Sequence, residues 1–254
     1  MNDHAAVVTS REEGVLRITL NRPAKKNALN SAMYAALNEV LAEAERAPEV
    51  RVVLLHGAGG DFTSGNDLED FACFDPATAE GPVVKFLTRF ATMTKPVVAA
   101  VEGVAVGIGT TLLLHCDLVY AAQTASFQLP FVRLGLCPEN ASSLLLPLLA
   151  GYQRATELLL LGEPFPAETA CEIGLVNSLL PAGETLTKAL EQSRKLAALS
   201  PVAVQASKAL LQRSRKEAVL ETIAAELVVF RQRLASPETA EALAAFFRRS
   251  QKER

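Results

Sequence analysis

Lys95-Pro96-Val97-Val98-Ala99-Ala100-Val101-Glu102-Gly103 leads into Val104-Ala105-Val106-Gly107-Ile108-Gly109, and this stretch of sequence decides the fold. The apolar run at 97–101 predicts a buried strand, and the glycines predict a loop that enters an apolar helix over 110–115. The glycines do not have G-x-G-x-x-G spacing and no Gly-Lys-Ser/Thr follows, so a nucleotide phosphate loop is unsupported. The junction instead predicts one exposed amide at a helix N-terminus, where the macrodipole favours negative charge.

Short strands and turns occupy the first two thirds of the chain, and helices occupy the last third. Alternating or continuous apolar residues predict strands over 15–20, 52–55 and 118–122. Helical periodicity predicts helices over 31–47, 82–93, 143–149, 155–161, 184–199, 201–213, 216–235 and 237–249. This division predicts an α/β fold in which residues 1–195 form a sheet-bearing core and residues 196–254 form a helical region.

The bulk composition limits the classes of function. Half of the 254 residues are hydrophobic, so the chain can bury a substantial core. The net charge of −3 and the lack of a basic stripe argue against a nucleic-acid partner. The four cysteines form no Cys-x-x-Cys pair and the three histidines lack metal-ligand spacing, so we expect reduced thiols and no metal. With no signal pattern and no apolar run long enough to span a bilayer, we expect a soluble cytoplasmic protein.

A second glycine-bearing segment, Asp61-Phe62-Thr63-Ser64-Gly65-Asn66-Asp67-Leu68, follows the buried strand at 52–55. Gly65 would let the backbone turn so that the amide of Asn66 points into a cavity. Taken alone, the segment fits a surface turn better, with Asp67 capping the helix that follows. Two amides from separate loops that converge on one oxygen would form an oxyanion hole.

Glu139 is a lone carboxylate in a stretch of apolar, small or uncharged residues, Leu136-Cys137-Pro138-Glu139-Asn140-Ala141-Ser142-Ser143. Apolar surroundings should raise its pKa, so that it can move a proton near neutral pH. Taken alone, the stretch fits the first turn of an ordinary helix better than a catalytic site. The two glycine-bearing segments upstream favour the catalytic interpretation.

Several short stretches, each weak alone, form a specific pattern through their order and spacing. They are Leu20-Asn21-Arg22-Pro23, Asn27-Ala28-Leu29, residues 62–68, residues 95–103, Gly107-Ile108-Gly109, Cys116-Asp117, Ala125-Ser126-Phe127, Gly174-Leu175-Val176 and Ser200-Pro201. This pattern resembles the crotonase superfamily, also called the enoyl-CoA hydratase/isomerase family, over nearly the whole chain. Residues 64–68 and the Cys-Pro-Glu with its following Ser-Ser are most similar to the peroxisomal-type Δ3,Δ2-enoyl-CoA isomerases.

The resemblance implies a core of repeated β-β-α turns in a spiral, with C-terminal helices that pack trimers or dimers of trimers. It implies an acyl-CoA thioester as ligand, with coenzyme A as part of the substrate and no separate cofactor. By position, the oxyanion-hole amides would belong to Asn66 and Ile108. Candidates to contact the CoA part are Arg22, Lys25, Lys26 and Ser64, although a solvated loop explains the three basic residues nearly as well.

The same resemblance separates two reactions. Family hydratases use two glutamates to split water, and Thr111 and Phe131 stand at those positions here. Family isomerases place one base where this chain has Glu139, so we expect a single-glutamate proton shuttle that moves a double bond into conjugation with the thioester. Phe131, Thr111 and Leu144 are expected to line the pocket, although Thr111 fits a bond to a helix carbonyl better than a catalytic role.

Three alternatives stay open from the sequence. One is enoyl-CoA hydration, and another is a different acyl-CoA lyase or hydrolase reaction that shares the oxyanion hole. The third, from another class, is a non-catalytic acyl-CoA-binding or RNA-binding relative. His115 lies on an apolar helix and is expected to be an interior histidine without a catalytic role.

Overall fold

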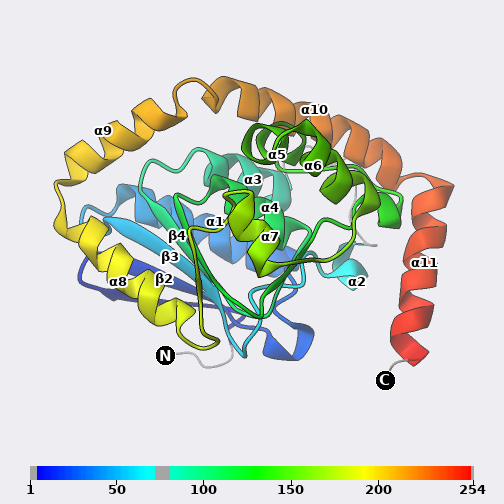
Figure 1. Ribbon diagram of the computed structural model, residues 1–254, viewed down its shortest axis with the longest axis horizontal. Coiled ribbons are helices and arrows are strands. Elements are labelled where there is room, and N and C mark those ends of the chain that lie inside the picture. The colour runs from blue at the N-terminus through cyan, green and yellow to red at the C-terminus, as the bar shows by residue number, and fades with distance from the viewer. Residues whose placement is uncertain (1–4, 72–80, 253–254) are drawn as a thin grey trace.

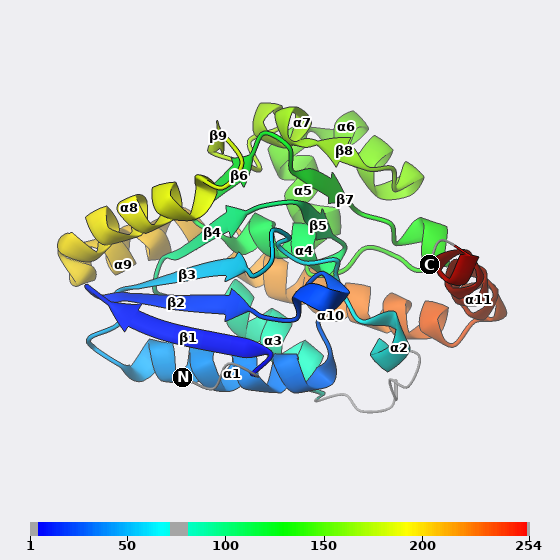
Figure 2. The same ribbon diagram turned by 90° about the horizontal axis from the view of Figure 1, so that it is seen from below.

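The computed structural model describes residues 5–71 and 81–252. Its main sheet has the strand order β1-β2-β3-β4-β6-β9. The strands are β1 (Val7–Glu12), β2 (Val15–Leu20), β3 (Val52–Gly57), β4 (Val97–Val101), β6 (Leu118–Ala122) and β9 (Ser178–Leu180). Only β1 and β2 pair antiparallel, and the other neighbours are parallel. Figure 2 shows β1 to β4 side by side.

A second, smaller sheet lies across the ends of these strands and contains β5 (Val104–Val106), β7 (Ser126–Gln128) and β8 (Phe165–Pro166). β5 follows β4, and β7 follows β6. Isolated parallel bridges join Leu29 to Asn66 and Thr63 to Ala105, so the earlier turns of the chain extend this second sheet. Each turn therefore runs from a long strand to a short segment of the second sheet and then to a helix. This is the expected ββα spiral.

Helices cover both faces of the main sheet. On one face pack α1 (Ser31–Arg46) and α3 (Pro82–Ala91), with α10 (Lys216–Leu234) against α3. On the other face lies α8 (Thr185–Ala198), where Ala189 and Ala197 meet Val52, Leu54 and Val98. Alternate residues of the buried strands thus point into two separate cores, which explains why these strands are apolar without a break.

The remaining helices are short elements of the core or parts of the C-terminal region. The short ones are η1 (Pro23–Lys25), α2 (Leu68–Phe71), α4 (Ile108–Thr111), η2 (Leu112–His115), η3 (Val132–Leu134), α5 (Ser142–Ala150), α6 (Tyr152–Thr156), η4 (Glu157–Leu161) and α7 (Ala167–Glu172). The C-terminal helices α9 (Pro201–Gln212) and α10 arch over the core, and α11 (Pro237–Lys252) stands at one end (Figure 1).

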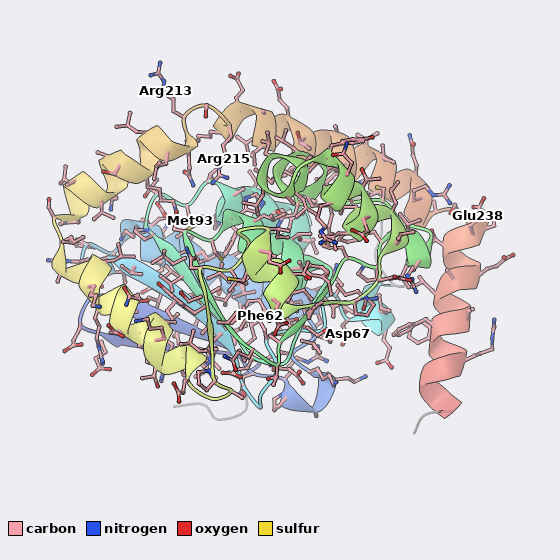
Figure 3. All side chains as sticks on the ribbon, viewed as in Figure 1. Phe62, Asp67, Met93, Arg213, Arg215 and Glu238 are labelled. Atoms are coloured by element: carbon pink, nitrogen blue, oxygen red, sulfur yellow. The ribbon has the colours of Figure 1, made fainter. Side chains whose placement is uncertain are left out.

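The structure does not draw a division between residues 195 and 196. That position falls inside α8, which packs on the sheet, so the chain leaves the core only at α9. Phe62 is completely buried, whereas Arg213 projects into solvent from the end of α9 (Figure 3). Within the described residues, no helix combines the length and apolar character needed to cross a membrane.

Candidate active site

Two consecutive turns of the spiral bring the segments of Asn66 and Ile108 together. Gly65 has φ +93°, and a Cβ atom built on it would lie 2.7 Å from the carbonyl oxygen of Val106. Only glycine fits this close approach in this backbone conformation. Gly107 has φ +56° and precedes Ile108, the first residue of α4. The two glycines therefore set adjacent loops side by side, as their spacing in the sequence indicated.

The backbone amides of Asn66 and Ile108 have no acceptor among the described residues. Within residues 5–71 and 81–252, neither amide donates to an acceptor of the chain, although the neighbouring amides of Asp67 and Gly107 both do. A buried amide without an acceptor is rare in folded proteins, and such groups often wait for a ligand. Ile108 also stands at a helix N-terminus, although α4 is too short for a large macrodipole. Two free amides in adjacent loops can hold one developing oxyanion.

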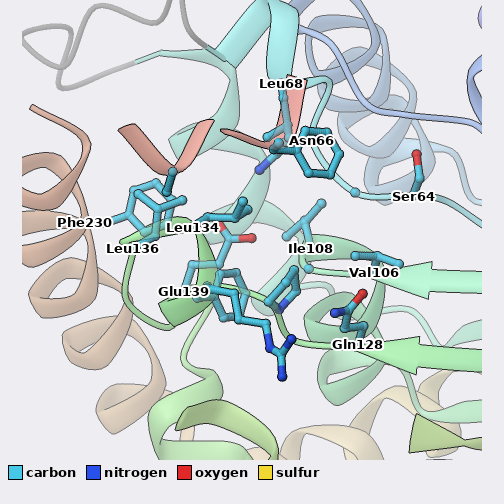
Figure 4. Close-up of a pocket in the computed structure, with 17 residues that line it drawn as sticks. Ser64, Asn66, Leu68, Val106, Ile108, Gln128, Leu134, Leu136, Glu139 and Phe230 are labelled. Atoms are coloured by element: carbon cyan, nitrogen blue, oxygen red, sulfur yellow. The ribbon is translucent and has the colours of Figure 1, made fainter. Parts of the chain in front are cut away.

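A cavity of about 300 Å³ opens between these loops and the C-terminal helices (Figure 4). The site residues Ser64, Asn66, Ile108, Phe131 and Glu139 all contribute to its wall. The remaining lining residues are Gly65, Leu68, Val106, Gly107, Gln128, Pro130, Arg133, Leu134, Leu136, Phe230, Ala242 and Phe246. Most of these side chains are apolar, so the cavity suits an acyl group better than a free sugar or nucleotide.

Glu139 is the single carboxylate among the described residues that line this cavity. Its side chain is 6% exposed, and Oε1 is fully buried with no hydrogen-bond partner in the described chain. Figure 4 shows the carboxyl group on the side of the cavity that holds Leu134 and Ile108. Burial raises the pKa of Glu139 to about 8, and the nearby charge of Glu226 adds to this effect. Glu139 therefore exchanges a proton in the neutral range.

Two side chains, those of Ser142 and His115, make short hydrogen bonds to the backbone around Glu139. The Ser142 hydroxyl donates to the Glu139 carbonyl at 2.6 Å. Nε2 of His115 lies 2.8 Å from the carbonyl oxygen of Asn140. Burial lowers the pKa of His115 to about 4, so the ring is neutral and must donate through Nε2–H, because a carbonyl only accepts. The expectation that His115 is an interior histidine is confirmed.

Tyr34 of α1 lies behind the Asn66 loop. Its hydroxyl donates to Asn66 Oδ1 at 2.5 Å. Burial raises the pKa of Tyr34 well above its usual value, and the charge of Glu139 raises it further. The phenol therefore stays protonated and holds the Asn66 side chain through its oxygen.

Two predicted lining residues are not part of the cavity wall. Thr111 is completely buried, and its hydroxyl donates to the Ile108 carbonyl oxygen at 3.4 Å. This is the bond to a helix carbonyl that the sequence predicted for Thr111. Leu144 lies on α5 and packs against the main core instead. Ile108 is the residue of α4 that lines the cavity, and Phe230 of α10 and Phe246 of α11 supply apolar wall in place of Leu144 of α5.

The basic residues proposed for the CoA part lie outside the cavity. Arg22 pairs with Asp67 at 2.9 Å, and its other nitrogen donates to the Ala28 carbonyl. Lys25 pairs with Glu69 at 3.0 Å, and both Lys25 and Lys26 are exposed. The Lys26 carbonyl accepts from the Ser64 amide, so this basic loop borders the cavity at Ser64.

Asp67 has two structural contacts. One carboxylate oxygen pairs with Arg22, and the other accepts from the Glu69 amide at 3.2 Å, so it caps α2 as its position indicated. The ion pair with Arg22 ties the end of β2 to the loop that carries Asn66.

Sequence reasoning missed Tyr34, Gln128, Phe230 and Glu226. Tyr34 and Phe230 look like ordinary core positions of amphipathic helices, and only the folded chain shows that they reach the site. Glu226 carried a usable signal, because it lies one helical turn before Phe230 on the buried stripe of α10. A carboxylate on a buried apolar stripe requires a hydrogen-bond or ion-pair partner. Among the described residues, no group of three or more His, Cys, Asp or Glu is placed to hold a metal ion.

The sequence profile of the enoyl-CoA hydratase/isomerase family matches residues 10–253. The chain belongs to this family. The 2,3-dehydroadipyl-CoA hydratase of Escherichia coli is 35% identical to it over 96% of both chains. Enoyl-CoA delta isomerase 2 of Rattus norvegicus is also 35% identical over 97% of this chain, which spans 64% of that protein.

Solved structures show the same fold. OdaA of Pseudomonas aeruginosa superimposes with a TM-score of 0.92 at 45% identity, over 95% of this chain and 98% of that one. Membership of the enoyl-CoA hydratase/isomerase family confirms the resemblance to crotonases and the mixed α/β fold with a helical C-terminal region. Because the relatives carry names of both reactions, the family leaves hydratase and isomerase undistinguished.

Proposed function

We propose that this protein is a Δ3,Δ2-enoyl-CoA isomerase, which converts a 3-enoyl-CoA into the conjugated 2-enoyl-CoA. One observation carries the proposal: among the described residues, Glu139 is the single carboxylate in the cavity wall. Moving a double bond needs one group that removes a proton and returns it. Adding water needs a base and an acid together, and a second carboxylate does not line this cavity in the described chain.

In the first step, ionised Glu139 removes a proton from C2 of the substrate. The electron pair of that C–H bond forms a C1–C2 double bond, and the thioester carbonyl electrons move onto its oxygen. The amides of Asn66 and Ile108 donate to this oxygen and stabilise the dienolate. Removing one such donor from an oxyanion hole typically costs about 2.7–4 kcal/mol of transition-state stabilisation.

In the second step, protonated Glu139 returns its proton to C4. The electrons of the C3–C4 double bond take up the proton, a C2–C3 double bond forms, and the thioester carbonyl is restored. The dienolate is planar, so one carboxyl group on one side of its plane can reach both C2 and C4. No atom is gained or lost, which agrees with a site that needs no separate cofactor.

The surroundings of Glu139 suit this shuttle. A pKa of about 8 makes the group both a usable base and a usable acid near neutral pH. Phe131, Leu134 and Leu136 line the same cavity, and apolar side chains there limit the access of water. Exclusion of water keeps the proton on Glu139 between the two steps and suppresses hydration of the product.

The test is a direct assay with a 3-enoyl-CoA and with crotonyl-CoA, followed by the ultraviolet absorbance of the conjugated thioester. The wild-type enzyme should isomerise the first substrate much faster than it hydrates the second. Glu139→Gln should lower isomerase turnover by roughly 10⁴-fold, because the sole proton carrier is removed. Glu221→Gln is the matched control, since Glu221 is exposed on α10. Fast hydration with negligible isomerisation contradicts the proposal.

We also propose that the protein works in the cytoplasm as a homotrimer or a dimer of trimers. Exposed apolar side chains on the C-terminal helices support assembly: Leu210 and Leu211 on α9 are 70% and 79% exposed, and Val228 on α10 is 56% exposed. Such side chains favour a protein interface. Analytical ultracentrifugation tests the assembly, and a monomer at micromolar concentration would contradict it.

A further inference from the structure

The backbone after Glu139 has an unusual conformation. Asn140 and Ala141 both have positive φ, at 59° and 57°, although neither is a glycine. L-residues rarely adopt this left-handed conformation, and a β-carbon such as that of Ala141 makes it unfavourable. Ala141 is also the N-cap of α5, where its side chain offers no hydrogen bond to the free amides of the helix. The loop therefore needs support from elsewhere in the chain.

Glu226 provides that support from α10, 85 residues later in the sequence. Its Oε2 accepts from the Ala141 amide at 2.6 Å. Its Oε1 accepts from the Ser143 amide at 3.0 Å and from the Ser143 hydroxyl at 2.5 Å. Glu226 is 8% exposed and has no ion-pair partner among the described residues. Its carboxylate thus caps α5 in place of the Ala141 side chain.

Glu226 acts on Glu139 without entering its cavity. Glu226 is absent from the cavity wall and borders a separate surface hollow with Cys137, Pro138 and Ser143. Two consecutive left-handed residues form a sharp turn, and Glu139 stands immediately before that turn. The direction in which the Glu139 side chain leaves the backbone is therefore fixed by the same bonds that hold Ala141 and Ser143.

We propose that Glu226 is a positioning residue, whose carboxylate holds the left-handed Asn140–Ala141 turn and so directs Glu139 into the cavity. The inference rests on the proposed role of Glu139 as the proton carrier. A second consequence follows from the charge: a carboxylate near Glu139 disfavours its ionised form.

The other titratable groups near Glu139 do not supply the negative charge that raises its pKa. Tyr34 on α1 stays protonated, because burial raises its pKa well above the usual value. Burial raises the pKa of Cys137 to about 11, so that thiol is also neutral. His115 contacts the next carbonyl as a neutral ring. Arg133 of η3 lines the cavity and pairs with Glu163 at 2.9 Å. Burial raises the pKa of Glu226 itself, whereas the bonds from Ser143 and Ala141 favour its ionised form. Ionised Glu226 is thus the negative charge that raises the pKa of Glu139.

Glu226→Gln removes this charge and replaces one acceptor with an N–H donor that faces the donors of Ala141 and Ser143. The matched control is Glu221→Gln, on the same helix but exposed. The pKa of Glu139 is measured by carbon-13 NMR of glutamate labelled at the δ-carboxyl carbon, with Glu139→Gln identifying its signal. The inference predicts that in Glu226→Gln the pKa of Glu139 falls below the wild-type value and stays above 4.5, because burial remains.

Turnover is measured on the same proteins. We expect kcat of Glu226→Gln to fall about 10- to 100-fold with little change in KM, because a small displacement of a reacting group has effects of this size. Glu226→Asp keeps the charge but shortens the side chain, so it should lower kcat while the pKa of Glu139 stays raised. This variant also tests the inference if Glu226→Gln does not fold.

A rescue experiment separates positioning from general damage. Glycine adopts the left-handed conformation without a penalty, so Ala141→Gly added to Glu226→Gln should raise kcat several-fold above that of Glu226→Gln alone. The lowered pKa of Glu139 should persist in this double variant. Recovery would not occur if Glu226 merely kept α10 folded.

Three results would overturn the inference. They are an unchanged Glu139 titration in folded Glu226→Gln, an equal effect of Glu221→Gln, and an absence of rescue by Ala141→Gly. Failure of the proposed function is distinguishable, because it shows as a wild-type enzyme without isomerase activity. The NMR titration does not depend on turnover, so it still decides whether Glu226 governs Glu139 in that case.

Discussion

Replacing Glu139 with glutamine should stabilise the protein at alkaline pH while it abolishes activity. The folded chain raises the pKa of Glu139 from 4.5 to about 8, mainly because the carboxyl group is buried. At about 1.36 kcal/mol per pH unit, the ionised form destabilises the folded protein by roughly 5 kcal/mol. Glu139 is 6% exposed, so solvent screening reduces this figure little. Glutamine has no charge and avoids the penalty.

The sign of the pH dependence follows from proton binding. Between pH 4.5 and about 8 the folded protein keeps a proton on Glu139 that the unfolded chain releases. Wild-type stability therefore decreases as pH rises through this window, and the full penalty is present above pH 8. Glu139→Gln should match the wild-type protein near pH 4.5 and exceed it by several kcal/mol at pH 9.

Urea unfolding of both proteins at pH 5 and pH 9 measures this difference, at one protein concentration because the proposed subunit association would contribute to stability. Glu221→Gln is again the control and should follow the wild-type protein at both pH values, since Glu221 is exposed. If the stability difference between Glu139→Gln and the wild-type protein were the same at pH 5 and pH 9, the burial argument for Glu139 would be refuted.

Further predictions concern the base, the oxyanion hole and the loop at the cavity edge. In a pH–rate profile, kcat/KM should rise with pH, reach half of its maximum at about pH 8 and level off above that, because Glu139 must be ionised in the free enzyme. A flat profile from pH 6 to 9 would exclude this base. Gly65→Ala should lower kcat at least 100-fold, because its Cβ would meet the Val106 carbonyl oxygen at 2.7 Å and displace the neighbouring amide. Carbon-13 NMR should show that the titration of Glu139 is unchanged in this variant. A near-normal kcat would contradict the assignment of the Asn66 amide to the oxyanion hole. Lys25→Ala combined with Lys26→Ala should raise KM several-fold for CoA thioesters but not for truncated thioesters that keep only the cysteamine part of CoA. Equal effects on both substrates would show that this loop does not bind CoA.

The long elements of this fold were predictable from local sequence. Strands β3, β4 and β6 are continuous apolar runs because both of their faces are buried, and the helices from α8 onward have clear periodicity. The short strands β5, β7, β8 and β9 were missed, since two or three residues carry no period. Strand β1 was missed because its residues are mixed and mostly half-exposed at the sheet edge.

The site residues that were predictable are those whose residue type differs from that of their neighbours in the sequence. Glu139 was recognisable as a lone carboxylate in an apolar stretch, and Gly65 and Gly107 marked the two loops that meet. Thr111 was misplaced because a position in a short helix does not reveal which side faces the cavity. Glu226 was missed because its partners lie 83 and 85 residues away, a pairing that only the folded chain creates.

The most direct test of the account is to follow one labelled proton. A 3-enoyl-CoA carrying deuterium at C2 is converted in ordinary water, and mass spectrometry locates the label in the product. If Glu139 alone moves the proton in a cavity with little water, part of the deuterium removed from C2 appears at C4, and Glu139→Gln gives no such transfer. If C4 gains only solvent hydrogen from the earliest turnovers, the single-carboxylate shuttle is wrong.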